Sequence, residues 1–286
     1  MKIGAVIQAR MSSTRLPDKV LKELPYRSGV TALQQIARRL KRSDMINEII
    51  IATTTDDEDR AIVSAADAES VRWFRGSKHD VLSRYYQAAK ENKLDIVVRL
   101  TGDCPCIDPE IADRVITEHI GGEADFTSNV IKRTFPHGMD VEVINFHALE
   151  IAHKEAKGDY EREHVMPYIY MNNAARFKVI GFEASRELYA PDIRITLDTG
   201  ADYVLLCAVF DYLYPDNAFF GTRDIINLFY EKPWLKLINE NVLQKKICDT
   251  LEDEIEEALK VLDLQDLKRA KEFLKKSKDD LENYKG

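Results

Sequence analysis

The chain has 286 residues, is 45% hydrophobic and carries a formal net charge of −8. This length fits one large domain, or one domain with a smaller appendage. The acidic balance argues against a general nucleic-acid-binding protein, whose surface is normally basic. No apolar run of about 18 residues occurs, so we expect no transmembrane helix and no membrane partner. Four cysteines without a secretory signal-type start indicate reduced thiols in a cytoplasmic protein.

The first part of the chain alternates strands and helices. Short β-branched apolar runs predict buried strands, and apolar residues at helical spacing, with polar or proline starts, predict the helices between them. The predicted strands cover residues 3–7, 48–54, 71–75 and 95–100, and the predicted helices cover residues 31–41, 60–69, 80–91 and 109–119. Four strand–helix pairs of this kind predict an α/β fold with a doubly wound, mainly parallel sheet.

The rest of the chain has a different character. Residues 140–144 alternate polar and apolar side chains, as a half-buried strand does. Further helices are predicted over residues 146–157, 160–171 and 203–214, and extended segments over residues 177–182 and 194–197. Leucines at helical and heptad spacing then predict a C-terminal helical hairpin over residues 245–286, appended to a domain over residues 1–244. The heptad leucines favour a homodimer.

A cationic loop follows directly on the first strand. Three permanent cations, Arg10, Arg15 and Lys19, stand among the hydroxyls of residues 12–14 in a protein that is acidic overall. Loops at the carboxyl ends of parallel strands are where open α/β sheets bind ligands. Arginine matches phosphate oxygens with a planar fork, and lysine acts as a point charge. This pattern predicts a clamp for a polyphosphate, and the alternative is a solvated surface loop.

Two aspartates at the ends of predicted strands are candidate metal ligands. Asp103 follows the strand over residues 95–100, and Asp198 ends the segment over residues 194–197. Mg²⁺ usually takes one or two protein carboxylates, and phosphates and water complete its shell. The alternative for each is a turn aspartate that bonds its own backbone. For the acidic cluster over residues 56–59, the first turn of the following helix is the preferred interpretation over metal binding.

Several familiar phosphate and nucleophile motifs are absent from the sequence. There is no Gly-x-x-x-x-Gly-Lys-Ser/Thr run, no Gly-x-Gly-x-x-Gly after a strand, and no Gly-x-Ser-x-Gly elbow. A phosphate site in this chain would therefore be built from arginine and lysine side chains and backbone amides.

Residues 7–21, Ile7-Gln-Ala-Arg-Met-Ser-Ser-Thr-Arg-Leu-Pro-Asp-Lys-Val-Leu21, resemble the signature of the cytidylyltransferases that activate acidic sugars. These are the CMP-KDO and CMP-sialic acid synthetases, and the SpsF-type branch, named for spore coat polysaccharide biosynthesis, is the most similar. The resemblance covers about residues 1–235 and continues, in order, through residues 52–55, 74–77, 80–86, 99–105, 138–143, 160–164 and 194–198.

The resemblance implies a fold similar to that of GT-A nucleotide-diphospho-sugar transferases, and a reaction in which CMP passes from CTP to an acidic sugar or related anionic acceptor and pyrophosphate leaves. It places Arg10, Ser12, Arg15 and Lys19 at the triphosphate, with Arg15 and Lys19 as the catalytic cations. Asp103 and Asp198 would bind Mg²⁺. Other residues expected at the nucleotide are Gln8, Ala9, Thr53, Arg75, Arg84 and Thr101.

The acceptor side is implied less specifically. Asp140, Glu142, Glu163 and His164 would line the second half of the cleft, whereas a salt-bridged helix face is the alternative for residues 161–163. The chain has Thr101 where the sugar-acid synthetases usually have glutamine before the Gly-Asp pair. Two other functions stay open at this point: a GT-A glycosyltransferase that uses a nucleotide sugar, and a non-catalytic partner that senses nucleotide.

Overall fold

The structure is a computed structural model that describes residues 1–242 and 251–284. It divides into two compact units, Met1–Asn241 and Val242–Gly286. The domain boundary predicted between residues 244 and 245 lies outside the described residues.

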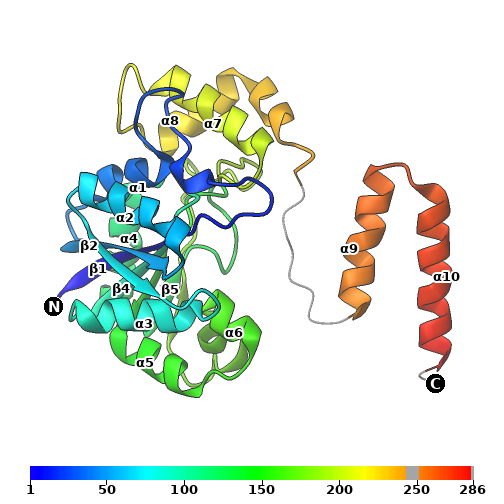
Figure 1. Ribbon diagram of the computed structural model, residues 1–286, viewed down its shortest axis with the longest axis horizontal. Coiled ribbons are helices and arrows are strands. Elements are labelled where there is room, and N and C mark those ends of the chain that lie inside the picture. Colours follow the sequence, from blue (N-terminus) through cyan, green and yellow to red (C-terminus); the bar gives the residue numbers. More distant parts are fainter. Residues whose placement is uncertain (243–250, 285–286) are drawn as a thin grey trace. The chain divides into compact units, whose positions relative to one another are not determined.

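The first unit is built on a mixed sheet whose seven strands, among the described residues, have the order β3-β2-β1-β4-β6-β5-β7 (Figure 1). The strands β3, β2, β1 and β4 run parallel, and β6 runs antiparallel to both β4 and β5. The predicted mixed, mainly parallel sheet is confirmed. In chain order the strands are β1 Ile3–Gln8, β2 Glu48–Thr54, β3 Arg72–Gly76, β4 Ile96–Thr101, β5 Phe126–Ser128, β6 Glu142–Asn145 and β7 Val179–Gly181.

Helices cover both faces of this sheet, as Figure 1 shows. Side chains alternate along each central strand, so Ile7 and Val98 enter the core on one face, and Val6 and Val97 enter the core on the other. The first core is closed by α1 Ala32–Leu40, α2 Arg60–Ala68, α4 Pro109–Gly121, α7 Gly200–Leu213 and α8 Thr222–Glu231. The second is closed mainly by α3 Val81–Glu91 and α5 Phe146–Glu155.

Short polar caps determine where several helices begin. Thr31 accepts a hydrogen bond from the Gln34 amide at 3.2 Å and opens α1, and Asp80 accepts from the Ser83 amide at 2.8 Å and opens α3. Such caps satisfy amides that have no partner within the helix. Because both caps are local, the sequence pattern locates these helix starts to within a residue or two.

The middle of the chain departs from the predicted elements in several places, among them the strand β5, which was not predicted. Residues 194–197, which the structure describes, do not form a strand, and Arg194 makes only an isolated bridge with His137. The predicted helix over residues 160–171 is broken after α6 Asp159–His164, because Val165 adopts a positive φ of 73°. A π-helical turn, η3 Tyr168–Asn172, follows this break. The helix α8 was not predicted.

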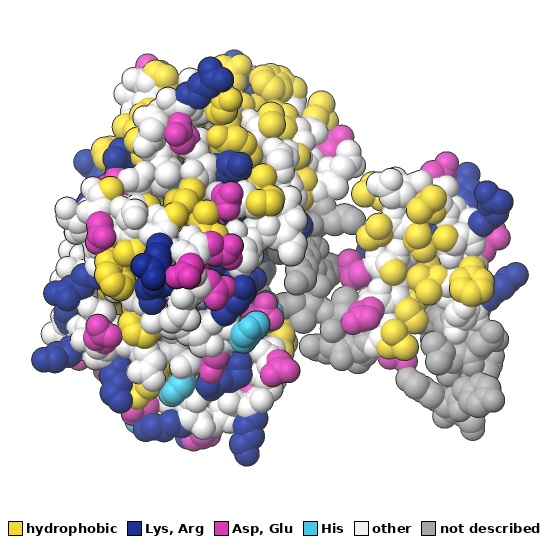
Figure 2. All heavy atoms as spheres, in the orientation of Figure 1, with side chains coloured by type: hydrophobic (Ala, Val, Ile, Leu, Met, Phe, Trp, Pro, Cys, Tyr) yellow, Lys and Arg dark blue, Asp and Glu magenta, His cyan; other side chains and the backbone are white. Residues whose placement is uncertain are grey.

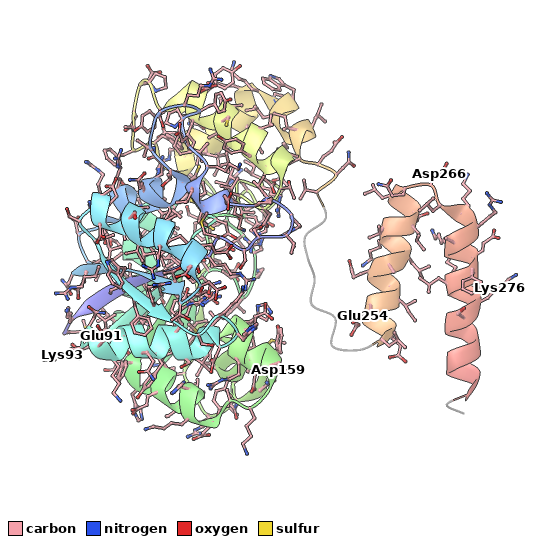
Figure 3. All side chains as sticks on the ribbon, in the orientation of Figure 1. Glu91, Lys93, Asp159, Glu254, Asp266 and Lys276 are labelled. Atoms are coloured by element: carbon pink, nitrogen blue, oxygen red, sulfur yellow. The ribbon has the colours of Figure 1, made fainter. Side chains whose placement is uncertain are left out.

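The second unit contains a helical hairpin of α9 Leu251–Leu264 and α10 Lys268–Tyr284. Ile255 is the one large apolar side chain of the hairpin that is buried among those described, whereas Phe273 is 73% exposed. Figure 2 shows apolar side chains of both helices gathered on one face, and Figure 3 places Asp266 at the turn between the helices. The side chain of Leu281, part of the predicted heptad pattern, lies outside the described residues.

Candidate active site

The loop after β1 is anchored from within the acidic cluster. The Met11 amide donates to Asp59 Oδ1 at 2.7 Å, and the Thr54 amide donates to Asp59 Oδ2 at 3.2 Å. Asp59 is fully buried, and among the described residues its side chain forms no capping bond to α2. Asp59 lies in the first turn of η2 and at the N-cap position of α2, as expected, but its side chain bonds the Met11 and Thr54 amides and does not cap α2. The Asp59 carboxylate fixes the start of the cationic loop against the end of β2.

Lys19 lies between the two candidate carboxylates. It begins the short helix η1 Lys19–Leu21, and its ammonium donates to Asp103 Oδ2 at 2.8 Å and to Asp198 Oδ1 at 2.9 Å. The Lys19 side chain is 15% exposed, Asp103 is 24% exposed and Asp198 is 16% exposed. Three segments far apart in sequence thus meet at one partly shielded point beyond the carboxyl ends of the strands.

Backbone hydrogen bonds bring the two carboxylates to this point. The carbonyl of Asp103 accepts from the Leu197 amide at 2.7 Å and from Thr196 Oγ1 at 3.2 Å, which binds the segment before Asp198 to the turn after β4. That turn is held to β1, because the Gly102 amide donates to the Gln8 carbonyl at 2.8 Å. A side chain on Gly102 would approach that carbonyl to 3.0 Å, so glycine suits the close packing.

A second set of cations surrounds Asp198. Arg15 reaches its Oδ1 at 3.0 Å, and Arg194 reaches its Oδ2 at 2.9 Å. Arg194 is itself oriented by Asp202, a fully buried carboxylate with contacts of 2.9 and 3.1 Å, which Asn239 also contacts at 2.9 Å. No site role was predicted for Arg194, Asp202 or Asn239. The Arg–carboxylate spacing is visible in the sequence, but Asn239 is brought in only by the fold.

The pKa values of this cluster favour its charged form. Burial alone would raise the pKa of Asp198, but Lys19, Arg15 and Arg194 outweigh burial and lower that pKa to about 2. Burial also opposes ionisation of Asp103, and Lys19 again lowers its pKa. Burial disfavours the charged ammonium of Lys19, yet Asp103 and Asp198 raise its pKa above the usual value. At neutral pH the cluster therefore holds one ammonium between two carboxylates.

The residues predicted at the nucleotide lie at the same edge of the sheet. Gln8 ends β1 and is paired in register with Thr101, the last residue of β4, while Thr53 lies near the end of β2. Among the described residues, Gln8 Oε1 and Thr53 Oγ1 are buried and have no hydrogen-bond partner. Buried polar atoms are normally satisfied, so these two atoms are exceptions, and the Thr53 side chain is fully buried.

Two of the predicted arginines at this edge, Arg75 and Arg84, bond backbone carbonyls, whereas Arg10 is exposed. Arg75 donates to the Thr54 and Asp56 carbonyls at 2.9 and 2.7 Å, and Arg84 donates to the Ser77 carbonyl at 2.7 Å. Both side chains therefore brace the loops around the edge. Arg10 is exposed on the loop after Ala9, and Ser12 on the same loop is half-buried.

The predicted acceptor residues separate into two groups. Asp140 accepts a bidentate pair of bonds from Arg133 at 2.8 and 3.1 Å, and Glu142 is buried in an ion pair with Arg99. The other two lie on α6, where Glu163 is exposed and His164 is half-buried with its ring 4.9 Å from that of Tyr160. The structure therefore brings Asp140 and Glu142 to the sheet and places Glu163 and His164 on a helix that contacts α3.

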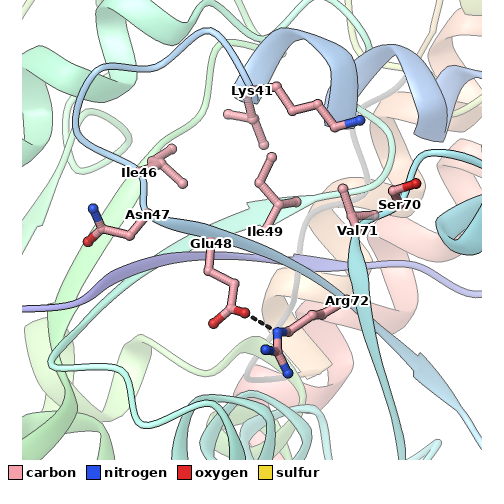
Figure 4. Close-up of a pocket in the computed structure, with 9 residues that line it drawn as sticks. Lys41, Ile46, Asn47, Glu48, Ile49, Ser70, Val71 and Arg72 are labelled. Carbon is pink, nitrogen blue, oxygen red and sulfur yellow. Dashed lines mark ion pairs between the residues drawn. The ribbon is translucent and has the colours of Figure 1, made fainter.

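A pocket elsewhere in the first unit is formed by other residues. It lies beside the first residues of β2 and β3, at the amino ends of these strands, and Lys41, Ile46, Asn47, Ile49, Ser70 and Val71 line it (Figure 4). Its charged pair, Glu48 and Arg72, is joined in an ion pair. Because the candidate residues lie at the carboxyl ends of the strands, this pocket is separate from the site.

The fold and this charged cluster at the carboxyl edge define a protein of the nucleotidyltransferase class. The sequence model of the cytidylyltransferase family matches residues 5–231, and the chain belongs to this family and is a CTP-dependent CMP-transferring enzyme. None of the helices in the described ranges has the length and hydrophobicity needed to cross a membrane.

Three comparisons support this membership. An uncharacterized protein of Methanocaldococcus jannaschii is 41% identical over 250 residues, which are 86% of this chain and 97% of that protein. The spore coat polysaccharide biosynthesis protein SpsF of Bacillus subtilis is 34% identical over 210 residues, which are 72% of this chain and 85% of SpsF. The structure of a cytidylyltransferase from Leptospira borgpetersenii is 35% identical with a TM-score of 0.76, over 87% of this chain and 99% of that one.

Proposed function

We propose that the enzyme transfers CMP from CTP to an acidic sugar or related anionic acceptor in the biosynthesis of a surface polysaccharide or glycoconjugate. The observation that carries this proposal is the Lys19 ammonium held between Asp103 and Asp198 beneath a cationic loop. The name of the Bacillus subtilis relative supports the polysaccharide context. A glycosyltransferase with an Asp-x-Asp metal motif is disfavoured, because Cys104 and Pro105 follow Asp103.

The proposed reaction is a displacement at the α-phosphorus of CTP. An acceptor oxygen forms a bond to that phosphorus, the bond to the β-phosphate oxygen breaks, and pyrophosphate leaves with the electron pair. Arg10, Arg15 and Lys19 would neutralise the charge on the phosphates. The anchored loop would hold the triphosphate of CTP in line for attack. Positioning and electrostatic stabilisation account for most of the catalysis in phosphoryl transfer.

Mg²⁺ is the proposed cofactor, and two observations support its fit. The two carboxylates already share a cation, the Lys19 ammonium, so their arrangement suits positive charge. The second oxygen of Asp103 faces the Cys104 thiol at 3.7 Å, and Thr101 also hydrogen-bonds to the Asp103 side chain, so this oxygen has neutral neighbours that a metal ion could replace. Asp103 and Asp198 would hold the ion, which when bound would withdraw charge from the phosphate oxygens.

The nucleotide base and the acceptor would occupy opposite sides of this cluster. Gln8 and Thr53 would lie beside the base or ribose, because they stand at or next to the carboxyl ends of β1 and β2. On the acceptor side, Asp140 and Glu142 would bind sugar hydroxyls while Arg133 and Arg99 balance their charge. Glu163 and His164 would extend this side from α6.

A nucleotide panel tests the proposal. Thermal stabilisation would be measured with CTP, UTP, GTP, dTTP, ATP and UDP-sugars in the presence of Mg²⁺, followed by pyrophosphate release with eight- and nine-carbon keto-acid sugars. We expect selective stabilisation by CTP and acceptor-dependent release. Stabilisation by UDP-sugars without a response to CTP would support the glycosyltransferase instead, and CTP binding without release for any anionic acceptor would favour a nucleotide-sensing partner.

A further inference from the structure

The helical hairpin of the second unit presents an apolar face that its own two helices leave open. Val261 on α9 and Phe273 on α10 are 42% and 73% exposed, and Leu251 at the start of α9 is 57% exposed. Ala258 and Ala270 lie three residues before Val261 and Phe273, so each pair shares one side of its helix. Figure 2 shows this continuous apolar face, which we call the hairpin face.

The two outer edges of the hairpin face carry opposite charges. On α9, Glu254 lies four residues before Ala258 and seven before Val261, on the same side of the helix. On α10, Arg269 and Lys276 lie four residues before and three residues after Phe273. Figure 3 shows Glu254 on the outer side of α9 and Lys276 on the outer side of α10. The hairpin face thus has an acidic residue at its α9 edge, and its α10 edge is basic on balance, with Glu272 between the two cations.

These opposite charges lie at similar heights above the turn. Glu254 is ten residues before Leu264, the end of α9, and Lys276 is eight residues after Lys268, the start of α10. At about 1.5 Å per residue, these separations are roughly 15 and 12 Å. An acidic edge and a basic edge at one height make a surface that is complementary to itself.

Only one two-fold arrangement uses this complementarity. If two hairpin faces pack about an axis parallel to the helices, each α9 lies against α10 of the other copy, and Glu254 faces Lys276. If the axis instead crosses the helices, α9 lies against α9 and α10 against α10, so that like charges meet. Isologous packing of a self-complementary patch is the usual basis of a homodimer.

We infer that the hairpin is a self-association module, in which two copies of the chain join through their hairpin faces into an antiparallel four-helix bundle with each α9 against α10 of the second copy. Leu251, Val261 and Phe273 form its apolar centre, and Glu254, Arg269 and Lys276 select the second copy and its orientation. Each helix in such a bundle is antiparallel to its neighbours, as in up-down-up-down bundles.

The apolar centre is tested on the full-length protein by sedimentation equilibrium over a range of concentrations. The wild type is expected to dimerise, and Phe273→Glu is expected to raise the dimer dissociation constant by at least about 100-fold, because it places a charge at the centre of the interface. Thermal stabilisation by CTP reports that the first unit of the variant is intact. A monomeric wild type, or a Phe273→Glu variant that dimerises as the wild type does, would overturn the inference.

The orientation is tested by exchanging charges. Glu254→Lys and Lys276→Glu are each expected to raise the dimer dissociation constant, by roughly 3- to 30-fold for two exposed pairs per dimer, and the double variant is expected to recover wild-type affinity. Lys275→Glu is the matched control, because it makes the same charge change one residue away on another side of α10. Single variants without effect, or a double variant without recovery, would contradict the packing of α9 against α10.

Discussion

At the scale of single residues, Lys19 organises the site. Its ammonium contacts the carboxylates of Asp103 and Asp198, and each of these follows a different segment of the fold. Without Lys19, two partly shielded carboxylates would face each other, and like charges in such a place raise one another's pKa. The same contact therefore supports stability and, in the proposed function, would prepare a site for phosphate.

The pH dependence of stability follows from the directions of these pKa values. The pKa of Asp198 is lowered to about 2, so its contribution is present above the unfolded value of about 3.9 and is lost as the pH falls through about 2. The pKa of Lys19 is raised, so its contribution is present below the unfolded value of about 10.4 and is lost as the pH rises through the folded value.

We therefore expect Lys19→Met to lower the free energy of unfolding by about 1–3 kcal/mol at neutral pH. The difference from wild type should stay constant between about pH 5 and pH 9, and should shrink in acid as the carboxylates are protonated. Urea unfolding of both proteins at a series of pH values measures this difference in the free energy of unfolding. A difference that grows steadily toward acid would contradict this description of the cluster.

Asp59 gives a second prediction at this scale. Asp59→Ala leaves the buried amides of Met11 and Thr54 without their acceptor, so we expect a loss of about 1–3 kcal/mol of stability together with weaker CTP binding. Asp57→Ala is the control, because that side chain is 90% exposed on the same short helix, η2 Asp57–Asp59. Urea unfolding and CTP titration check both variants. Equal behaviour of the two would mean that Asp59 does not anchor the loop.

At the scale of elements, the segment before Asp198 depends on a glycine turn. Gly138 has a φ of 116°, a conformation that suits glycine, and an added Cβ would lie 2.8 Å from the Ile195 carbonyl oxygen. Beside this turn the His137 amide donates to the Ile193 carbonyl and the His137 carbonyl accepts from the Ile195 amide, which sets the path toward Asp198. The turn thus positions one of the two carboxylates.

Gly138→Ala should accordingly destabilise the protein by about 1–3 kcal/mol or more, since backbone strain and a close contact add. Gly200→Ala is the comparison, because nothing lies within 4 Å of its added Cβ at the start of α7. Thermal or urea denaturation measures both changes. If the Gly138→Ala variant were as stable as the Gly200→Ala variant, the backbone around Gly138 and Ile195 would be able to relax at little cost, and the prediction would be contradicted.

The local elements were predictable from the sequence, whereas several long-range contacts were not. Strand β2 and helix α1 follow from residue type, spacing and a local cap. The segment over residues 194–197 resembles a strand in its residue pattern, but its backbone bonds go to loops, including the Asp103 carbonyl. Asp59 resembles a helix cap in the sequence. Its bond to the Met11 amide could not be predicted, because Met11 is 48 residues away. The positive φ of Val165, a β-branched residue, has no signal in the sequence at all.

At the scale of the whole molecule, the two units carry separate roles. The first unit contains every residue of the candidate active site, and the second unit contains the hairpin face. If these roles are independent, Phe273→Glu should change the dimer dissociation constant without changing turnover per chain. Lys19→Met should instead reduce turnover per chain without changing the dimer dissociation constant. Steady-state kinetics and sedimentation of both variants check this, and a loss of turnover in dilute wild type as well as in Phe273→Glu would show that the units are coupled.

The central claim is that the Lys19–Asp103–Asp198 cluster and its cationic loop form the triphosphate site for CTP. The most direct test is pyrophosphate release at saturating CTP, together with thermal stabilisation by CTP and Mg²⁺, in wild type, Lys19→Met and the surface variant Lys154→Met. Lys19→Met is predicted to lose stabilisation by CTP and to reduce turnover by roughly 10²- to 10³-fold, while Lys154→Met behaves as wild type. Equal CTP stabilisation and turnover in the two lysine variants would contradict the claim.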